Sequence, residues 1–582
     1  MHMEKVEQKI TFGKLKKLLT CQPYFIWNSV EDLGLDKNDD DIDQFSFQMP
    51  GIVDVVAPTV TQVQMKTFHK VNEEFYDFIQ TLGRVAWTSK MSSMEERAEE
   101  TKKLLRNPGV DIIFEPVFRY GDAFSVPTIY DKKNKKISNL KISSSTKRID
   151  LVKPYFDYQI ANKCNVKVEA ISYFVLDTKK YKAFEIAFYE TFKVNTSTTS
   201  RNDKNAKQHN DFVSMRRKKT GNGVNKKGVH DEKNTIFNIV ACAAEFGSKS
   251  KPIQFEGIDY YIRLIKEAKD AEFENGLTAE DNQAFGSNPA TPTIIEYLHP
   301  QFVGYNGKFV KKKDIQEGKT LQEIADNSLL IQSILNEPVT ITERDEAHSY
   351  IERLEKSRVI WYDFEGFSLP FPTIAGFTPF QQATFQVSII ETNNMEEKKK
   401  INHIYDPQTF SYTDFPELID MIYSNKADYY VVYNAGYENP RMMEMVATLR
   451  DMNYPGWVEV QEKVLWIIER TVDLAKPFAA GSKDSLPIVF IPELKGKHSI
   501  KLIEKYITKN NYWFKDMIKP YKDLTIQNGG MAMEAAIQRA IGVVGDNEWE
   551  EKQGVLKEYC ENDVRAMIMV YQLIKELFKQ KS

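Results

Sequence analysis

The amino-acid sequence predicts an α/β protein with more than one domain. Apolar segments of strand length alternate with amphipathic segments of helix length in two separate parts of the chain, a pattern typical of sheets covered by helices. The chain has 582 residues, more than one ordinary hydrophobic core holds, since a domain has on the order of 150 residues. We therefore expect an α/β domain near each end of the chain and a connecting region between them.

Charge, cysteine usage and hydropathy exclude several classes of protein. The formal net charge is −4, so any surface that binds phosphate groups must come from local clusters of Lys and Arg. The cysteines lie far apart, which indicates neither a disulfide framework nor a CxxC metal site and favours a reducing compartment. They are Cys21, Cys164, Cys242 and Cys560. The longest apolar stretch, residues 236–246, is shorter than the ~20 residues of a membrane span, and residues 1–9 lack an apolar signal region. We expect a cytoplasmic protein without a membrane partner.

The first domain is predicted over residues 1–190. Strand-like runs occupy residues 110–120, 140–145 and 168–177, and residues 94–105 have a helical pattern. From 191 to 230 the chain becomes polar, and residues 195–228 hold nine Lys or Arg against two Asp. We interpret this stretch as a basic flexible arm. Its cluster Arg216, Arg217, Lys218 and Lys219 would either contact a phosphate backbone or lie in a solvated loop.

A helical connector is predicted over residues 231–357, with helices near 257–270, near 319–335 and after Thr342. The second α/β domain follows over residues 358–582. Its predicted strands are residues 359–366, 383–390 and 429–434, and its predicted helices cover residues 414–425, a segment beginning at Asn439 and a C-terminal amphipathic segment. HExxH, GxSxG and P-loop patterns are absent from the sequence, which argues against protease, esterase and NTPase activities.

Three short patterns in the second domain place carboxylates where they can meet. Asp363 and Glu365 are two apart at the end of an apolar strand, so their side chains share one face of the sheet. Glu438 follows a strand that ends at Asn434, and we expect it at a helix start formed with Asn439 and Pro440. Carboxylates that point together repel, and a divalent cation between them makes the arrangement tolerable.

The third pattern lies on the C-terminal helix, where Tyr559 and Asp563 are four apart and share a face. Each pattern alone also has an ordinary structural interpretation. An Asp-x-Glu pair is common on surface strands, a Glu at a helix start is favoured by the macrodipole, and a Tyr-x-x-x-Asp pair is frequent on helices. The order of the three, on a strand, a strand-to-helix turn and the last helix, is more specific.

DFE, YNxxYE and YCxxDV resemble the motifs of the DEDD superfamily of 3′-to-5′ exonucleases, in the branch whose third motif is YxxxD. Residues 359–577 also resemble a bacterial domain family of unknown function that shares DFE, PFQ, IQNGGMAM and YCxxDxxAM. The resemblance implies an RNase H-like mixed sheet flanked by helices. It also implies two Mg²⁺ or Mn²⁺ ions held by four carboxylates, with Tyr559 orienting or deprotonating the attacking water. The four carboxylates are those of Asp363, Glu365, Glu438 and Asp563.

The same resemblance implies supporting roles for two further residues, and this chain departs from the family pattern at a third. We expect Asn434 and Asp473 to contact and orient the metal ligands without binding the metal themselves. The superfamily usually has Asp at the second motif, where this chain has Glu438, one methylene longer.

The first domain resembles RecB-type nucleases of the PD-(D/E)XK fold, also called restriction-endonuclease-like, through residues 11–28, 112–118 and 140–162. Its helix Gln is present as Gln159, whereas Thr128 stands at the metal-binding Asp position. Lys141 and Ser143 replace the Glu and Lys of the Glu-x-Lys motif. Glu115 is a single remaining carboxylate, so we expect a degenerate, catalytically inactive domain. Cys21 has no further cysteines spaced for an iron–sulfur cluster, and none is expected.

These patterns predict a metal-dependent nuclease, a 3′-to-5′ exonuclease that acts on a single-stranded 3′ end of DNA or RNA. Phe367, close to the first motif, is a candidate for stacking a terminal base. Two alternatives stay open: a nucleic-acid-binding or scaffolding protein in which both domains are inactive, and an endonuclease that uses the same metals.

Overall fold

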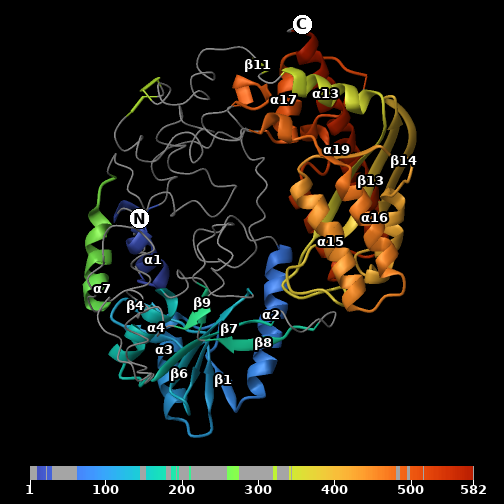
Figure 1. The fold of residues 1–582 in the computed structure, drawn as a ribbon. Coiled ribbons are helices and arrows are strands. Elements are labelled where there is room, and N and C mark those ends of the chain that lie inside the picture. Colours follow the sequence, from blue (N-terminus) through green and yellow to red (C-terminus); the bar gives the residue numbers. More distant parts are fainter. Residues whose placement is uncertain are drawn as a thin grey trace, which may run out of the picture. The chain divides into compact units, whose positions relative to one another are not determined.

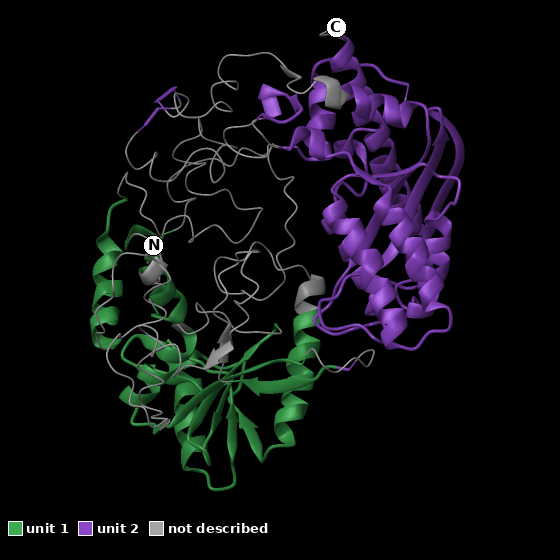
Figure 2. Ribbon diagram, in the orientation of Figure 1, with its two compact units in different colours: residues 1–38, 48–180, 186–297 green, residues 39–47, 181–185, 298–582 purple. Residues whose placement is uncertain are grey.

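The chain forms two compact units, each built around a mixed sheet flanked by helices, so the predicted α/β class is confirmed (Figures 1 and 2). Unit 1 comprises residues 1–38, 48–180 and 186–297, and unit 2 comprises residues 39–47, 181–185 and 298–582. The structure is a computed structural model. It describes residues 9–20, 23–28, 62–143, 152–177, 185–191, 193–195, 209–211, 258–273, 319–320, 322–323, 340–341, 344–479, 486–494, 498–515 and 517–580.

Unit 1 contains a six-stranded mixed sheet with the order β1-β2-β5-β6-β7-β8, in which β1 is parallel to β2 and β6 is parallel to β7. The strands are β1 (Val85–Trp87), β2 (Ile112–Phe114), β5 (Ile129–Asp131), β6 (Lys136–Lys141), β7 (Ala170–Leu176) and β8 (Phe188–Thr191), with a separate pair of β3 (Phe118–Tyr120) and β4 (Ala123–Ser125). The helices are α1 (Phe12–Thr20), α2 (Gln62–Gln80), α3 (Met94–Arg106), α4 (Val152–Lys163) and α7 (Ile258–Glu267), with 3-10 turns at Pro23–Ile26 and Ala268–Asp270.

Local signals in the sequence explain several of these elements. α3 begins with a capping box in which the Ser93 side chain accepts from the Glu96 amide and the Glu96 side chain accepts from the Ser93 amide. On α2, the Phe75 ring packs against the rings of Phe174 and Phe188 of the sheet, with centroids 5.2 and 5.0 Å apart. The single strand predicted over residues 110–120 is wrong, because Glu115 has a left-handed φ of 48° that separates β2 from β3.

The predicted connector over residues 231–357 is not a separate helical region where it is described. α7 packs within unit 1, where the Trp27 indole donates to the Ile265 carbonyl at 2.6 Å. α13 (Arg344–Glu355) packs within unit 2, where the Tyr571 hydroxyl donates to the Ile351 carbonyl at 2.6 Å. The helix predicted near 319–335 falls almost wholly outside the described residues. In the predicted arm, β9 (Lys193–Asn195) and β10 (His209–Asp211) form an antiparallel pair.

Unit 2 contains a five-stranded mixed sheet with the order β14-β13-β12-β15-β16. β13 is antiparallel to both of its neighbours, whereas β15 is parallel to β12 and β16. The strands are β12 (Arg358–Phe367), β13 (Ala383–Asn393), β14 (Glu396–Ile404), β15 (Tyr429–Val432) and β16 (Thr471–Asp473), with a small separate pair of β11 (Thr340–Ile341) and β17 (Val489–Phe490). The helices besides α13 are α14 (Phe415–Ile422), α15 (Ala435–Asp451), α16 (Trp457–Glu469), α17 (Ile500–Lys509), α18 (Gly529–Ala540) and α19 (Asp546–Gln580), with 3-10 turns at Tyr412–Asp414, Lys476–Phe478, Pro492–Leu494 and Tyr521–Asp523.

The burial of each strand agrees with its position in the sheet. β12 is buried along almost its whole length, as expected for a strand with neighbours on both sides and helices over it. β14, which the sequence analysis did not predict, is an edge strand with a run of exposed Glu and Lys that blocks pairing with another chain. α19 packs across β12, β13 and β14. The Gln386 and Asn402 amides of β13 and β14 fix its position by donating to its Leu556 and Lys557 carbonyls at 3.0 and 2.7 Å.

Among the residues that the structure describes, the helices lack the combination of length and apolarity that a membrane span requires.

A buried ion pair in unit 1 gives a direct test of its packing. Asp157 of α4 is fully buried and accepts from Lys153 Nζ at 2.7 and 2.8 Å. Replacing Lys153 with Met leaves this charge without its cation, and we expect α4 and β6 to lose roughly 3 kcal/mol of stability. Amide hydrogen exchange of the two elements measures the loss. Glu99→Ala, which removes an exposed ion pair to Lys102, is the control and should change exchange little. Equal protection in Lys153→Met and wild type would contradict this account of the core.

Candidate metal centre

The first wall of the site is the C-terminal half of β12. Asp363 pairs in register with Ser388 and Glu365 with Gln386, and the register then shifts between Glu365 and Gly366. A bulge at this point re-aims the strand beside the acidic residues. Glycine is favoured there, because a Cβ on Gly366 would lie 2.6 Å from the Tyr437 hydroxyl and 3.3 Å from the Ala383 carbonyl oxygen. Tyr437 of α15 therefore packs directly against the strand backbone behind Glu365.

The second wall is the first turn of α15. The helix begins at Ala435 and not at Asn439 as predicted, and Pro440 lies inside it. Asn434 precedes it with a left-handed φ of 75°, a conformation that Asn tolerates better than most residues. The Asp473 carboxylate, at the end of β16, accepts from the Asn434 and Ala475 backbone amides, both at 3.0 Å. Asp473 thus holds the turn that leads to Glu438. The Asn434 side chain is exposed and makes no cap hydrogen bond.

Glu438 is the most deeply buried of the predicted ligands, at 2% exposure. Among the atoms that the structure describes, its Oε2 has no hydrogen-bond partner. Burial, and then the charge of Asp363, raise the pKa of the Glu438 carboxyl well above its ordinary value. A carboxylate in this position is stable only with a proton or a nearby cation, since an isolated buried charge costs several kcal/mol.

The third wall is α19, which contributes Tyr559, Cys560 and Asp563 within one helical turn. Tyr559 and Cys560 are buried, and the Cys560 Sγ lies 3.8 Å from Asp363 Oδ2. The Tyr521 hydroxyl donates to Asp563 Oδ1. Burial raises the pKa of Asp563 to about 6, against hydrogen bonds from Tyr521 and Tyr559 that lower it.

The pKa shifts show that side chains of β12, α15 and α19 interact electrostatically within one site. Burial is the first cause that raises the pKa values of Asp363 and Glu365 well above the ordinary range, and the next causes are the charges of Asp563 and Asp363. Lys501, near the start of α17, opposes the shifts of Glu365 and Asp563. Its Nζ donates to the Gln527 carbonyl at 2.7 Å and lies 5.2 Å from the Tyr521 ring centroid. A buried ammonium in the first turn of a helix is unfavourable by itself, and the carboxylates around it offset that cost.

The five residues predicted to carry the chemistry therefore act on one another in one site, with Glu365, Glu438 and Tyr559 buried. Asp363 and Asp563 are half-buried. Cys560, Tyr521 and Lys501 belong to the same site and were not predicted. The prediction that Phe367 stacks a base is wrong: it is 1% exposed and packs edge-on against Phe385, with ring centroids 5.9 Å apart. The basic residues of the predicted arm lie outside the described residues. They are Arg216, Arg217, Lys218 and Lys219.

Unit 1 has a different polar cluster at the place where the sequence predicted a degenerate site. Thr128 Oγ1 accepts from the Leu140 amide at 2.9 Å, so it stabilises the sheet. The carboxylate missed by sequence is Asp157, which also accepts from Ser125 Oγ at 2.7 Å and Asn139 Nδ2 at 3.0 Å. Its lone pairs are taken by protein donors and by the Lys153 ammonium. Gln159, on the same helix, is half-buried.

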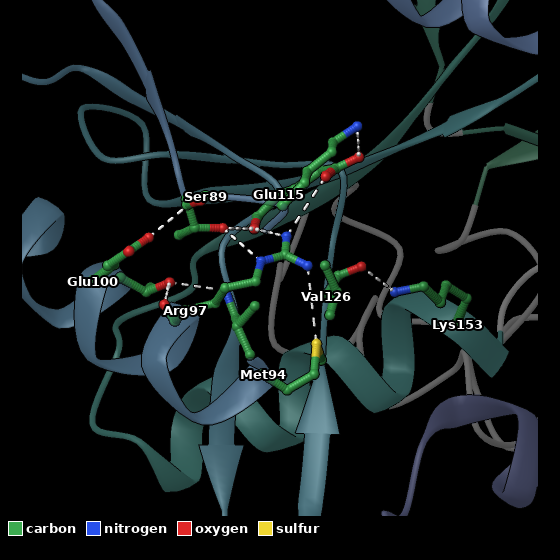
Figure 3. Close-up of polar contacts among 11 residues, drawn as sticks. Ser89, Met94, Arg97, Glu100, Glu115, Val126 and Lys153 are labelled. Atoms are coloured by element: carbon green, nitrogen blue, oxygen red, sulfur yellow. Dashed lines mark hydrogen bonds and ion pairs between the residues drawn. The ribbon is translucent and has the colours of Figure 1, made fainter. Parts of the chain in front are cut away.

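Glu115, the other carboxylate of this region, is held by cations (Figure 3). Its carboxylate oxygens lie 3.5 Å from Lys90 Nζ and from Arg97 Nη2, and its carbonyl accepts from Arg97 Nη2 at 3.2 Å. Lys153 donates to the Val126 carbonyl at 2.9 Å in the same view. Cations of the chain thus occupy the surroundings of both carboxylates, an arrangement that favours structure over metal binding.

The raised pKa of Asp563 predicts a distinctive pH dependence of stability. Its folded value of about 6 lies above its ordinary 3.8, so the ionised carboxylate destabilises the metal-free fold above pH 6. We expect Asp563→Asn to raise the thermal unfolding midpoint at about pH 8, and this gain should shrink as the pH falls through 6 toward 3.8. The comparison is made in chelator, with Asp420→Asn, an exposed carboxylate paired with Lys463, as control. A gain that does not depend on pH would contradict the electrostatic origin.

Sequence comparisons match part of unit 2 to a known domain family. Residues 360–499 match the family described as Domain of unknown function (DUF2779). The uncharacterized protein MG366 of Mycoplasma genitalium is 34% identical over 231 residues, which cover 39% of this chain and 33% of that protein. The MG366 homolog of Mycoplasma pneumoniae is 34% identical over 229 residues, covering 38% of this chain and 32% of that protein. The uncharacterized protein UU173 of Ureaplasma parvum is 32% identical over 230 residues, covering 39% of this chain and 32% of that protein.

The chain spans about a third of the length of these curated relatives. No solved structure matches the chain. The matched residues include most of β12 and all of β15 and α15, and hence Asp363, Glu365 and Glu438. The predicted resemblance of residues 359–577 to a domain family of unknown function is confirmed for residues 360–499, which match DUF2779.

Proposed function

We propose that unit 2 is a metal-dependent nuclease that hydrolyses phosphodiester bonds of DNA or RNA from the 3′ end. The observation that carries the proposal is the Glu438 carboxylate, which is buried beside Asp363 with an oxygen that lacks a protein partner among the described residues. Oxygen ligands from four carboxylates suit Mg²⁺ or Mn²⁺, and cations between them would relieve the repulsion that raises their pKa values. The ligands would be Asp363, Glu365, Glu438 and Asp563.

The fold supports an assignment to the RNase H-like DEDD exonucleases. The sheet is mixed, with one strand antiparallel to the two beside it, and helices flank it as that family requires. The first motif lies on the central strand β12, the second at the start of α15, which follows the parallel neighbour β15, and the third on the last helix. Three elements far apart in the sequence therefore converge on one buried site, which is the arrangement that the motifs imply.

When bound, the two ions would activate a water molecule and stabilise the leaving oxygen. The residues of the chain determine how that water is held. Burial and the nearby carboxylates raise the pKa of Tyr559 well above its ordinary value, so its hydroxyl keeps its proton. In the metal-free protein Tyr559 therefore carries the proton with which it would orient the water by hydrogen bonding. Lys501 adds a positive charge on the same side as Asp563 and favours an anionic substrate.

The competing proposal, a nucleic-acid-binding or scaffolding protein without catalysis, requires that both units are inactive, and the ion pairs of unit 1 bear on that unit alone. The Lys153–Asp157 pair and the cations around Glu115 satisfy the carboxylates of that unit without a metal. We propose that unit 1 is a degenerate RecB-like domain without catalytic activity of its own.

Cleavage assays with the full chain test the activity. With Mn²⁺ or Mg²⁺, we expect end-labelled DNA or RNA to be shortened from the 3′ end, and Asp363→Asn and Asp563→Asn to abolish the shortening. Asp420→Asn, an exposed acidic residue of the same unit, should cleave like wild type. Wild-type binding without cleavage on single- and double-stranded substrates of both kinds would favour the non-catalytic alternative. Internal cuts in place of stepwise shortening would indicate an endonuclease.

Two buried tyrosines beside Asp563 allow a matched test of the water-orienting role. Tyr559→Phe removes the hydroxyl that the motifs assign to catalysis, and we expect the cleavage rate to fall by at least about a hundredfold. Tyr521→Phe removes the hydroxyl that donates to Asp563 Oδ1, and we expect a smaller loss together with weaker Mn²⁺ binding. Single-turnover rates and Mn²⁺ titrations separate the two effects. Equal losses in the two variants would show that Tyr559 has no special part in the reaction.

A further inference from the structure

Cys560 lies among the proposed metal ligands, although neither the motifs nor the comparisons give it a role. Its side chain is fully buried, and its Sγ lies 3.8 Å from Asp363 Oδ2. One ligand atom each of Asp363, Glu365 and Cys560 lie within 4.8 Å of one another. On α19, Cys560 precedes Asp563 by three residues, so the two side chains are neighbours on the helix surface.

The separation of sulfur and oxygen fits a shared metal ion. A Zn²⁺ ion at ~2.3 Å from a thiolate and ~2.1 Å from a carboxylate oxygen holds the two atoms about 3.6 Å apart at a tetrahedral angle and about 3.8 Å apart at 120°. The observed distance of 3.8 Å needs no movement of either residue. Without an ion, the thiol is a weak donor directed at Asp363, whose carbonyl oxygen also lies 3.8 Å from Sγ.

The ligand type then determines which ion binds. Carboxylate oxygens suit Mg²⁺ and Mn²⁺, whereas a thiolate adds preference for thiophilic ions such as Zn²⁺. We propose that Cys560 is a metal ligand that acts together with Asp363 and Glu365, so that one position of the centre binds Zn²⁺ in preference to Mg²⁺. This inference rests on the proposed metal-dependent function. Binding converts the thiol to a thiolate, and its proton is released to the solvent.

Cadmium is the probe for this ligand, because a thiolate bound to Cd²⁺ gives an ultraviolet charge-transfer band that carboxylates do not give. We expect the full-length wild type to show the band on titration with Cd²⁺ at neutral pH. Cys560→Ser and Asp363→Asn should lose it, and Cys164→Ser, the other described free cysteine, should keep it. Zn²⁺ affinity should fall at least about tenfold in Cys560→Ser, while Mg²⁺ affinity changes less than about twofold.

The outcomes separate this inference from the proposed function. If the band persists in Cys560→Ser, or if wild type binds Mn²⁺ and gives no band, Cys560 is not a ligand, while the carboxylate centre stands. If wild type binds none of these ions, the inference and the proposed function both fail. Cys560→Ala serves as the second variant, because a small apolar side chain suits this buried position even if serine disturbs the fold. Its loss of the band with an unchanged unfolding midpoint would support the inference.

Discussion

The main physical constraint on unit 2 is the mutual repulsion of four carboxylates that lie in one site. Asp363 and Glu365 come from β12, Glu438 from α15 and Asp563 from α19. The charges of Asp363, Glu438 and Asp563 each raise the pKa of at least one other carboxyl of the four. Burial multiplies the repulsion, because charges interact more strongly where water is excluded. The rest of the unit must therefore hold these groups together against their own electrostatics. A central strand paired on both sides and a helix of 35 residues supply that rigidity.

Residues around the site meet the same constraint in different ways. Gly366 leaves space for the Tyr437 hydroxyl, and Asp473 holds the turn before Glu438 by accepting from the Asn434 backbone amide. Lys501 offsets part of the negative charge. What remains is a cluster of acidic side chains whose repulsion the proposed divalent cations would relieve. In unit 1 the same problem has another solution, since Lys153 gives Asp157 an internal cation and the site becomes a structural one.

Period-2 and period-3.6 patterns predicted the parts of the site that lie within single elements. Asp363 and Glu365 follow from strand alternation, and Tyr559 with Asp563 from helical spacing. Contacts between distant segments gave no such signal. Tyr521 donates a hydrogen bond to Asp563, which is 42 residues away in the sequence. Cys560 lies between two predicted residues but belongs to no spacing pattern of its own. Pro440 suggested a helix start near Asn439. The actual start at Ala435 depends on the Asp473 carboxylate, 39 residues away from the turn that it holds.

The central claim, that the buried carboxylates form a metal centre, is tested most directly by locating the ions. Crystals of the full chain grown with Mn²⁺ should show anomalous density among Asp363, Glu365, Glu438 and Asp563, with Glu438 Oε2 facing an ion. Absence of density there, with Glu438 Oε2 hydrogen-bonded to a protein donor, would contradict the account and leave the cluster as a protonated, structural one.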